Sequence, residues 1–116
     1  MTSITRFALP LGIAITAAAC GSSEVPNKQF AESQSAVRAA SEVGADGNPQ
    51  ASLHLKMARD QISKAQALSR EGEHAAAKQL LKQAEVDAEL ALTLTRAEQA
   101  QRDEEQAEQQ LQSLSQ

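Results

Sequence analysis

Apolar residues recur every three or four positions along most of the chain, and this is the period of an amphipathic α-helix. The pattern begins around Phe30, Val37 and Ala40. Asn27 is placed to cap a short first helix, and Gly44 is placed to end it. The period predicts an all-α fold.

The segment from residue 44 to 49 (GADGNP) is the clearest turn signal in the sequence. Asn48 as an N-cap and Pro49 as the first helical residue predict the start of a second helix, which we expect to run to about Glu71. Its apolar stripe consists of Ala51, Leu55, Ala58, Ile62, Ala65 and Leu68.

A third helical stretch begins near Glu73, with spacings of four and three that are typical of a coiled-coil seam. Its stripe consists of Ala77, Leu81, Ala84, Ala88 and Ala91. On a helical wheel of roughly 100° per residue, the second and third stripes differ by about 90°. One straight helix would not turn both stripes toward a single partner, so Gly72 predicts a tight corner between two antiparallel helices.

Residues 98–116 form a tail that is rich in Gln and Glu. Ala100, Ala107, Leu111 and Leu114 make a weak stripe that points well over 90° away from the stripe before it. The predicted fold is therefore a short first helix followed by an antiparallel helical hairpin with a long C-terminal helix. The outer half of that helix either projects into solvent or meets another chain.

The first residues have the three regions of a secretory signal. Met1–Arg6 carries one positive charge and no acid, Phe7–Ile15 is apolar, and Thr16–Ala19 is small. The apolar stretch is shorter than the roughly 20 residues of a membrane-spanning helix. We therefore predict a signal peptide over residues 1–19, a tether over 20–28, a helical hairpin domain over 29–97 and a helical tail over 98–116.

Three small residues, Ala17, Ala18 and Ala19, directly precede Cys20, which is the only cysteine. This arrangement resembles the lipobox of bacterial lipoproteins, although Leu usually stands where Ala17 does. The resemblance implies a diacylglycerol on the sulfur of Cys20, cleavage before it, and an acylated (for example palmitoylated) N-terminus. Ala17 and Ala19 also fit the ordinary signal peptidase, which would leave a free thiol. By resemblance to enteric lipoproteins, Gly21 implies the outer membrane, facing the periplasm.

The run from Leu55 to Ala91 resembles bacterial lipoproteins catalogued as domain-of-unknown-function family 4398. These proteins have a signal, a short tether and an alanine-rich helical hairpin, and the similarity covers about residues 36–97. The segment 84–91 (AEVDAELA) resembles the end of the family's second hairpin helix. The resemblance implies a location in the cell envelope and a fold, and it implies no activity.

The hairpin also resembles a single tetratricopeptide repeat. Gly72, Ala77, Leu81 and Ala84 have the spacing of that repeat's second helix, and Ala65 fits the first. Arrays of this kind need about three repeats for a stable stack, and no second copy is found. A tetratricopeptide-like module that binds a protein or peptide of an envelope complex is the alternative prediction.

Charge is unevenly distributed along the sequence. The whole chain has a net charge of −4, which disfavours nucleic acid as a partner because such sites gather Lys and Arg on one face. Residues 56–82 hold six basic side chains and three acids, whereas residues 85–116 hold eight acids and two arginines. Lys56, Lys64 and Lys78 mark a possible partner surface for an acidic protein or for the tail of another copy.

No catalytic constellation is found in the sequence. Much of the 41% hydrophobic content is alanine, and Trp and Tyr are absent, so we expect thin helix packing without an enclosed pocket. His54 and His74 lack metal-ligand spacing and are expected on the surface. We predict a non-enzymatic envelope lipoprotein with no cofactor and no metal, held by membrane lipid and acting through an envelope protein partner or self-association.

Overall fold

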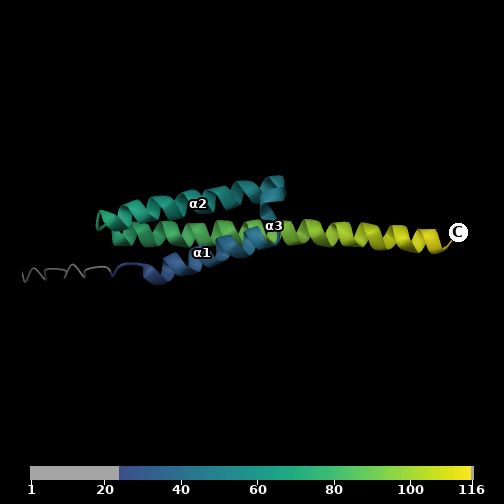
Figure 1. Cartoon of the computed structure of the whole chain (residues 1–116), viewed down its shortest axis with the longest axis horizontal. Helices are drawn as coiled ribbons and strands as arrows, with labels where there is room; N and C mark the ends of the chain where they lie inside the picture. Colours follow the sequence, from purple (N-terminus) through teal and green to yellow (C-terminus); the bar gives the residue numbers. More distant parts are fainter. Residues whose placement is uncertain (1–23, 116) are drawn as a thin grey trace, which may run out of the picture.

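The computed structural model describes residues 24–115, and this part of the chain is helical nearly throughout (Figure 1). The described residues form three α-helices: α1 (Asn27–Glu42), α2 (Pro49–Arg70) and α3 (His74–Leu114). One short 3-10 helix, η1 (Ala45–Gly47), lies between α1 and α2. The predicted fold class is confirmed: a short first helix precedes an antiparallel hairpin whose second arm is the longer one.

The first helix starts slightly earlier than the sequence predicts. Asn27 is the first residue of α1 and not its cap, because Pro26 precedes the helix and no side chain caps it. The helix therefore includes the last two residues of the predicted tether. Its end agrees with the prediction, since Gly44 adopts a left-handed conformation with φ of 92°, and its N–H donates to the carbonyl of Ser41 at 3.0 Å.

The start of α2 agrees with the prediction in detail. The side chain of Asn48 accepts a 2.7 Å hydrogen bond from the backbone N–H of Ala51, which satisfies one of the unpaired donors in the first turn. Pro49 is the first helical residue, where the missing N–H costs nothing. The side chain of Asn48 also bonds to Glu98 of α3, so the cap joins the two arms of the hairpin.

Gly72 makes a sharp corner between α2 and α3, as predicted. It adopts a left-handed conformation with φ of 84°. The N–H of Gly72 donates to the carbonyl of Ser69 at 3.2 Å, and that of Glu73 donates to the carbonyl of Leu68 at 2.9 Å. These two bonds form a Schellman motif, which satisfies carbonyls at the end of α2 and reverses the chain.

The two predicted stripes meet along the hairpin and form its core. All five residues of the α3 stripe are buried, and so are five of the six residues of the α2 stripe, with Leu68 partly exposed. Most of these residues are alanines, whose small side chains let the helices approach closely. Leu55 and Leu81 are the largest side chains in the described part that are buried almost completely.

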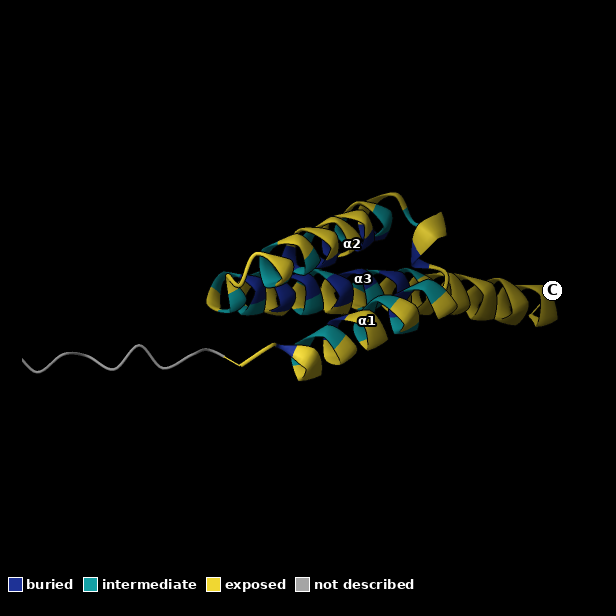
Figure 2. Cartoon of the chain, turned by 60° about the vertical axis from the view of Figure 1, so that its left-hand side comes forward, coloured by how far each residue is buried: buried dark blue, intermediate teal, exposed yellow. Residues whose placement is uncertain are grey.

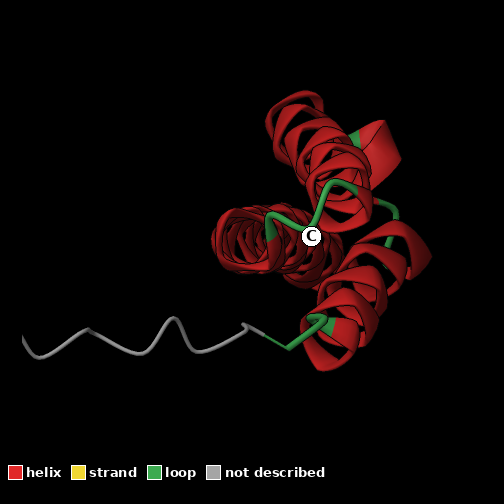
Figure 3. Cartoon of the chain, turned by 90° about the vertical axis from the view of Figure 1, so that its left-hand side faces the viewer, coloured by secondary structure: helices red, strands yellow, loops and turns green. Residues whose placement is uncertain are grey.

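Helix α1 completes the bundle from one side (Figures 2 and 3). It packs more extensively against α3 than against α2. Ser33 and Ala40 are its buried residues, and Phe30, Ala36 and Val37 are partly buried against the core. Seen along its length, the bundle has the three helices at the corners of a triangle (Figure 3).

The last part of α3 extends beyond the bundle, and we call residues 99–115 the arm. The side chain of Gln99 donates to the carbonyl of Val43 at 2.9 Å, which marks where the bundle ends. Every residue of the arm is exposed (Figure 2), and Leu111 and Leu114 are 68% and 83% exposed. The stripe that the sequence shows in this region has no partner within the described part of the chain.

The corner at Gly72 yields a prediction about stability. A Cβ at Gly72 would meet no atom within 4 Å, so Gly72→Ala introduces only the strain of a left-handed backbone, about 1–2 kcal/mol. We expect urea unfolding followed by circular dichroism to show this loss in the free energy of unfolding. Gly47→Ala is the control, because Gly47 has equal space and no positive φ, and its effect should stay within about 0.5 kcal/mol. Equal effects of the two changes would contradict the assignment.

Candidate functional site

The residues that the sequence predicts for the anchor lie outside the described part of the chain. Cys20 and its neighbours Ala17, Ala18 and Ala19 precede residue 24, where the description begins. No helix of the described residues is long and apolar enough to cross a membrane. The structural description of candidate sites therefore concerns the surface of the bundle and the arm.

The three lysines of the predicted partner surface are divided between the two arms of the hairpin. Lys56 and Lys64 are exposed on α2, eight residues apart, and Lys78 is partly buried near the start of α3. None of the three makes an ion pair with a carboxylate of the described residues. They do not line the cavities that the helices form.

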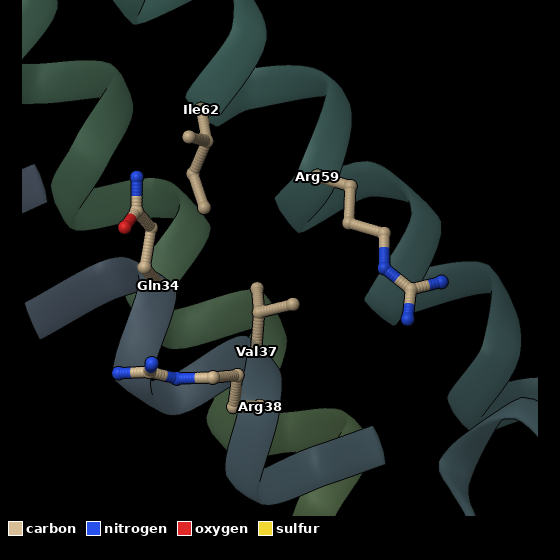
Figure 4. Close-up of a pocket in the computed structure, with 5 residues that line it drawn as sticks. All are labelled: Gln34, Val37, Arg38, Arg59 and Ile62. Atoms are coloured by element: carbon tan, nitrogen blue, oxygen red, sulfur yellow. The ribbon is translucent and has the colours of Figure 1, made fainter. Parts of the chain in front are cut away.

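A cavity lies between α1 and α2, and we call the space between these two helices the α1/α2 cleft. Because α1 leans on α3, it leaves α2 partly uncovered. The first section of the cleft has a volume of about 320 Å³. Its apolar floor is formed by Val37 and Ile62, which point into the gap between the two helices (Figure 4). Gln34, Arg38 and Arg59 form its rim.

A second cavity lies between the same two helices, nearer the start of α1. This second section of the cleft has a volume of about 270 Å³, with Phe30 from α1 at its apolar side and Arg70 from α2 at its polar side. Asn27, Gln66 and Ser69 complete its polar rim. Across both sections the lining residues include three arginines and no Asp or Glu. The cleft is thus an apolar groove with a cationic rim.

The three arginines differ in whether a carboxylate of the described residues already neutralises their charge. The guanidinium group of Arg59 donates to a carboxylate oxygen of Asp46 at 3.0 Å and to the hydroxyl of Ser41 at 2.9 Å. These bonds connect α2 to the end of α1 and to η1, so Arg59 has a structural role. Arg38 and Arg70 form no ion pair with a carboxylate of the described residues. Their charges remain available at the rim.

A polar cluster joins α2 to α3 on the side away from α1. One carboxylate oxygen of Asp87 lies 3.0 Å from Nδ1 of His54, and the other accepts a 2.8 Å hydrogen bond from the amide of Gln61. The side chains of His54 and Asp87 are 29% and 17% exposed. Partly shielded from water, these bonds set the register of the two arms. Among the residues described, no three His, Cys, Asp or Glu side chains gather into a metal site.

The same side of the hairpin carries exposed apolar residues. Leu53 and Met57 of α2 are 57% and 41% exposed, and Val86 and Leu90 of α3 are 64% and 40% exposed. Leu53 and Leu90 line a shallow cavity of about 330 Å³ together with His54 and Leu94. No arginine or lysine lines this cavity, whereas arginines line the α1/α2 cleft.

By its fold, the protein is an alanine-rich helical hairpin with a third helix packed against it. The sequence matches the family described as Domain of unknown function (DUF4398) over residues 28–111, which includes almost all of the three helices. The chain belongs to this family, as the resemblance in the sequence predicts. Comparisons with curated proteins and with solved structures found no match.

Sequence reasoning missed both the α1/α2 cleft and the link between His54 and Asp87. His54 and Asp87 are 33 residues apart in sequence, so no local spacing connects them. The only sequence signal is that each lies next to a stripe residue, Leu55 or Ala88, and so at the edge of the buried seam. The arginines of the cleft come from two helices and have no shared motif.

The polar cluster yields a second prediction. Asp87→Ala removes the acceptors for His54 and Gln61, and the loss of two partly buried hydrogen bonds should lower the free energy of unfolding by about 1–3 kcal/mol. Asp60→Ala is the matched control, since Asp60 is exposed on α2 and forms no side-chain bond of this kind; its effect should be within about 0.5 kcal/mol. Both are measured by urea unfolding. If Asp87→Ala is as mild as the control, the cluster does not stabilise the hairpin.

Proposed function

We propose that the protein is a small cell-envelope lipoprotein, anchored through acylated Cys20 and acting without catalysis as a structural or adaptor protein. The observation that carries the proposal is in the sequence: an apolar signal segment ends in Ala17, Ala18 and Ala19 directly before the only cysteine. Several acyl chains on such a cysteine give stable anchoring, because each buried CH₂ contributes about 0.8 kcal/mol. With Gly21 next to it, the proposed address is the outer membrane, facing the periplasm.

The arrangement of the helices is consistent with this anchor. The first turn of α1 lies beside the last turn of α2, since Asn27 and Phe30 line the same cavity as Gln66 and Arg70. The proposed tether, from Cys20 to Pro26, therefore joins the bundle at the end where Gly72 forms the corner. Seven extended residues reach at most about 25 Å. The bundle is thus kept close to the leaflet by its corner end.

The arm leaves the bundle at the opposite end. Helix α3 runs without interruption from His74 to Leu114, which is about 60 Å at 1.5 Å per residue. The start of α1 and the tip of the arm are therefore at opposite ends of the long axis (Figure 1). A protein with an anchor at one end and an exposed, charged helix at the other is suited to connect a membrane to a partner.

The proposed adaptor role assigns partner contact to the charged helical surfaces. The side chains of Lys56 and Lys64 are exposed on α2 and Lys78 lies on α3, and none of the three is paired with a carboxylate of the described residues. Unpaired cations of this kind steer association with an acidic protein surface. A tetratricopeptide-like capture of a peptide would use the same residues.

The anchor is tested on the mature N-terminus. In a bacterial host, Cys20→Ser should move the protein from the membrane fraction to the soluble periplasmic fraction, because no thiol remains to accept the diacylglycerol. Ser22→Ala, two residues away, should leave the protein in the membrane. Mass spectrometry of the unaltered chain should give an acylated N-terminal cysteine; an unmodified Cys20, or cleavage elsewhere, would refute the anchor.

The adaptor surface is tested by crosslinking in intact cells. We expect the triple variant Lys56→Glu, Lys64→Glu and Lys78→Glu to reduce the yield of a crosslinked envelope partner roughly tenfold, because like charges now face the partner. Lys28→Glu is the control, since it changes one exposed charge on α1 and should keep the yield. Unchanged crosslinks in the triple variant would exclude this surface.

A further inference from the structure

We propose that the α1/α2 cleft is the docking site for the arm of a second copy of this chain. The proposal is independent of the anchor, because both surfaces lie within the described helices. It is based on three matched properties of the cleft and the arm: apolar pattern, charge and length.

The first match is the apolar pattern. With successive residues roughly 100° apart, Ala100, Ala107, Leu111 and Leu114 fall within an arc of about 60° on the arm. The two leucines are 68% and 83% exposed, which leaves a narrow apolar stripe in water. The floor of the cleft offers apolar side chains in both sections, Val37 and Ile62 in the first and Phe30 in the second.

The second match is charge. The arm carries Arg102 and four acids, Asp103, Glu104, Glu105 and Glu108, so its net side-chain charge is −3. On the helical wheel Asp103 borders one side of the apolar stripe, and Glu104 and Glu108 border the other. These carboxylates would therefore meet both rims of a groove in which the stripe is seated.

Both rims of the cleft are cationic. Arg38 lies on the α1 side of the first section and Arg59, which is paired with Asp46, on its α2 side (Figure 4). Arg70 lies on the α2 side of the second section, and no acid lines either section. Arg38 and Arg70 have no carboxylate partner among the described residues. The cavity on the other side of the hairpin, beside Leu53 and Leu90, has an apolar surface without these cations. Charge therefore favours the α1/α2 cleft over that cavity.

The third match is length, and it also identifies the donor of the arm as another copy. The cleft extends from Asn27 to Arg38 along α1, about 17 Å, and the stripe from Ala100 to Leu114 is about 21 Å long at 1.5 Å per residue. The arm of the same chain cannot enter, because α3 is one continuous helix that leaves the bundle at the end opposite the Gly72 corner. Two antiparallel copies can each donate an arm to the other's cleft, which gives a closed, two-fold dimer. Because the two corner ends then lie at opposite ends of the dimer, anchored copies would form it with its long axis along the leaflet.

Docking would also stabilise the helix of the arm. A solvent-exposed helix of this length is marginal by itself and gains most of its stability from packing an amphipathic face. In the dimer each arm becomes a fourth helix against the partner's α1 and α2. Because the contact combines apolar burial with opposite charges, it should weaken as salt rises.

The test is a disulfide between two differently tagged copies of the full chain, expressed together and oxidised in intact cells of a bacterial host. One copy carries Gln34→Cys, at the rim of the cleft, and the other carries Leu111→Cys, on the arm. We expect a linked peptide pair containing positions 34 and 111, identified by mass spectrometry so that any link through Cys20 is recognised separately. Leu53→Cys replaces Gln34→Cys as the control, since Leu53 is exposed on the other side of the hairpin, and it should give at least roughly tenfold less product.

Charge reversal completes the test. Arg38→Glu with Arg70→Glu in one copy, or Glu104→Arg with Glu108→Arg in the other, should each reduce the 34–111 product roughly tenfold. Combining the two sets should restore most of it, which a merely misfolded variant would not do. Any of three results would overturn the proposal. The first is absence of the 34–111 product in the unreversed pair, and the second is equal linking of Leu111→Cys to the Leu53→Cys control. The third is failure of the combined reversal to restore the 34–111 product. A link through Cys20 would count against the anchor and leave the dimer unaffected.

Discussion

The close approach of α2 and α3 along their alanine stripes is the constraint on which the rest of the structure depends. Alanine contributes little apolar area, so the seam stabilises the fold through many small buried side chains spread along both helices. Only a few larger side chains, such as Leu55 and Leu81, fill the remaining space. A core this thin cannot enclose a pocket. Within the described residues, the surfaces open to a partner are the grooves between helices and the part of α3 that the bundle does not cover.

A seam of small residues needs other contacts to define its register. Asp87 receives bonds from two positions on α2, and the cap residue Asn48 bonds to Glu98 at the far end of the hairpin. Arg59 joins α2 to the segment that follows α1. The contacts of Asp87 and Asn48 lie at the edges of the seam and are partly buried, whereas those of Arg59 are exposed. Together they hold in register three helices whose apolar faces alone would tolerate sliding.

The position of α1 gives the bundle its asymmetry. By packing chiefly against α3, this helix leaves a cleft beside α2 with an apolar floor and an arginine rim. At one end of the molecule are the Gly72 corner and the start of α1, and at the other end is the acidic arm. Arg38 and Arg70 of the cleft and the four acids of the arm are thus separated in space, so that they cannot neutralise each other within one chain. This separation is the physical basis for the proposed contact between copies.

Most of the fold could be predicted from the sequence, because its determinants are local. The period of three and four residues identified the helices, Asn48 and Pro49 identified the start of α2, and two glycines identified the ends of helices where only a left-handed backbone closes the turn. The phase difference between the stripes was enough to predict the corner at Gly72. The one local error was Asn27, which continues a helix that begins after Pro26 without a side-chain cap.

The candidate site could be predicted only in part. The lone Cys20 and the charge asymmetry are visible in the sequence, and the family membership agrees with the resemblance that the alanine pattern shows. Only the tertiary structure decided which faces remain uncovered: how far α1 leans from α2, that Arg38, Arg59 and Arg70 border one groove, and that His54 reaches Asp87. These relations join residues that are distant in sequence, and they depend on packing angles between helices, which a periodic pattern does not encode.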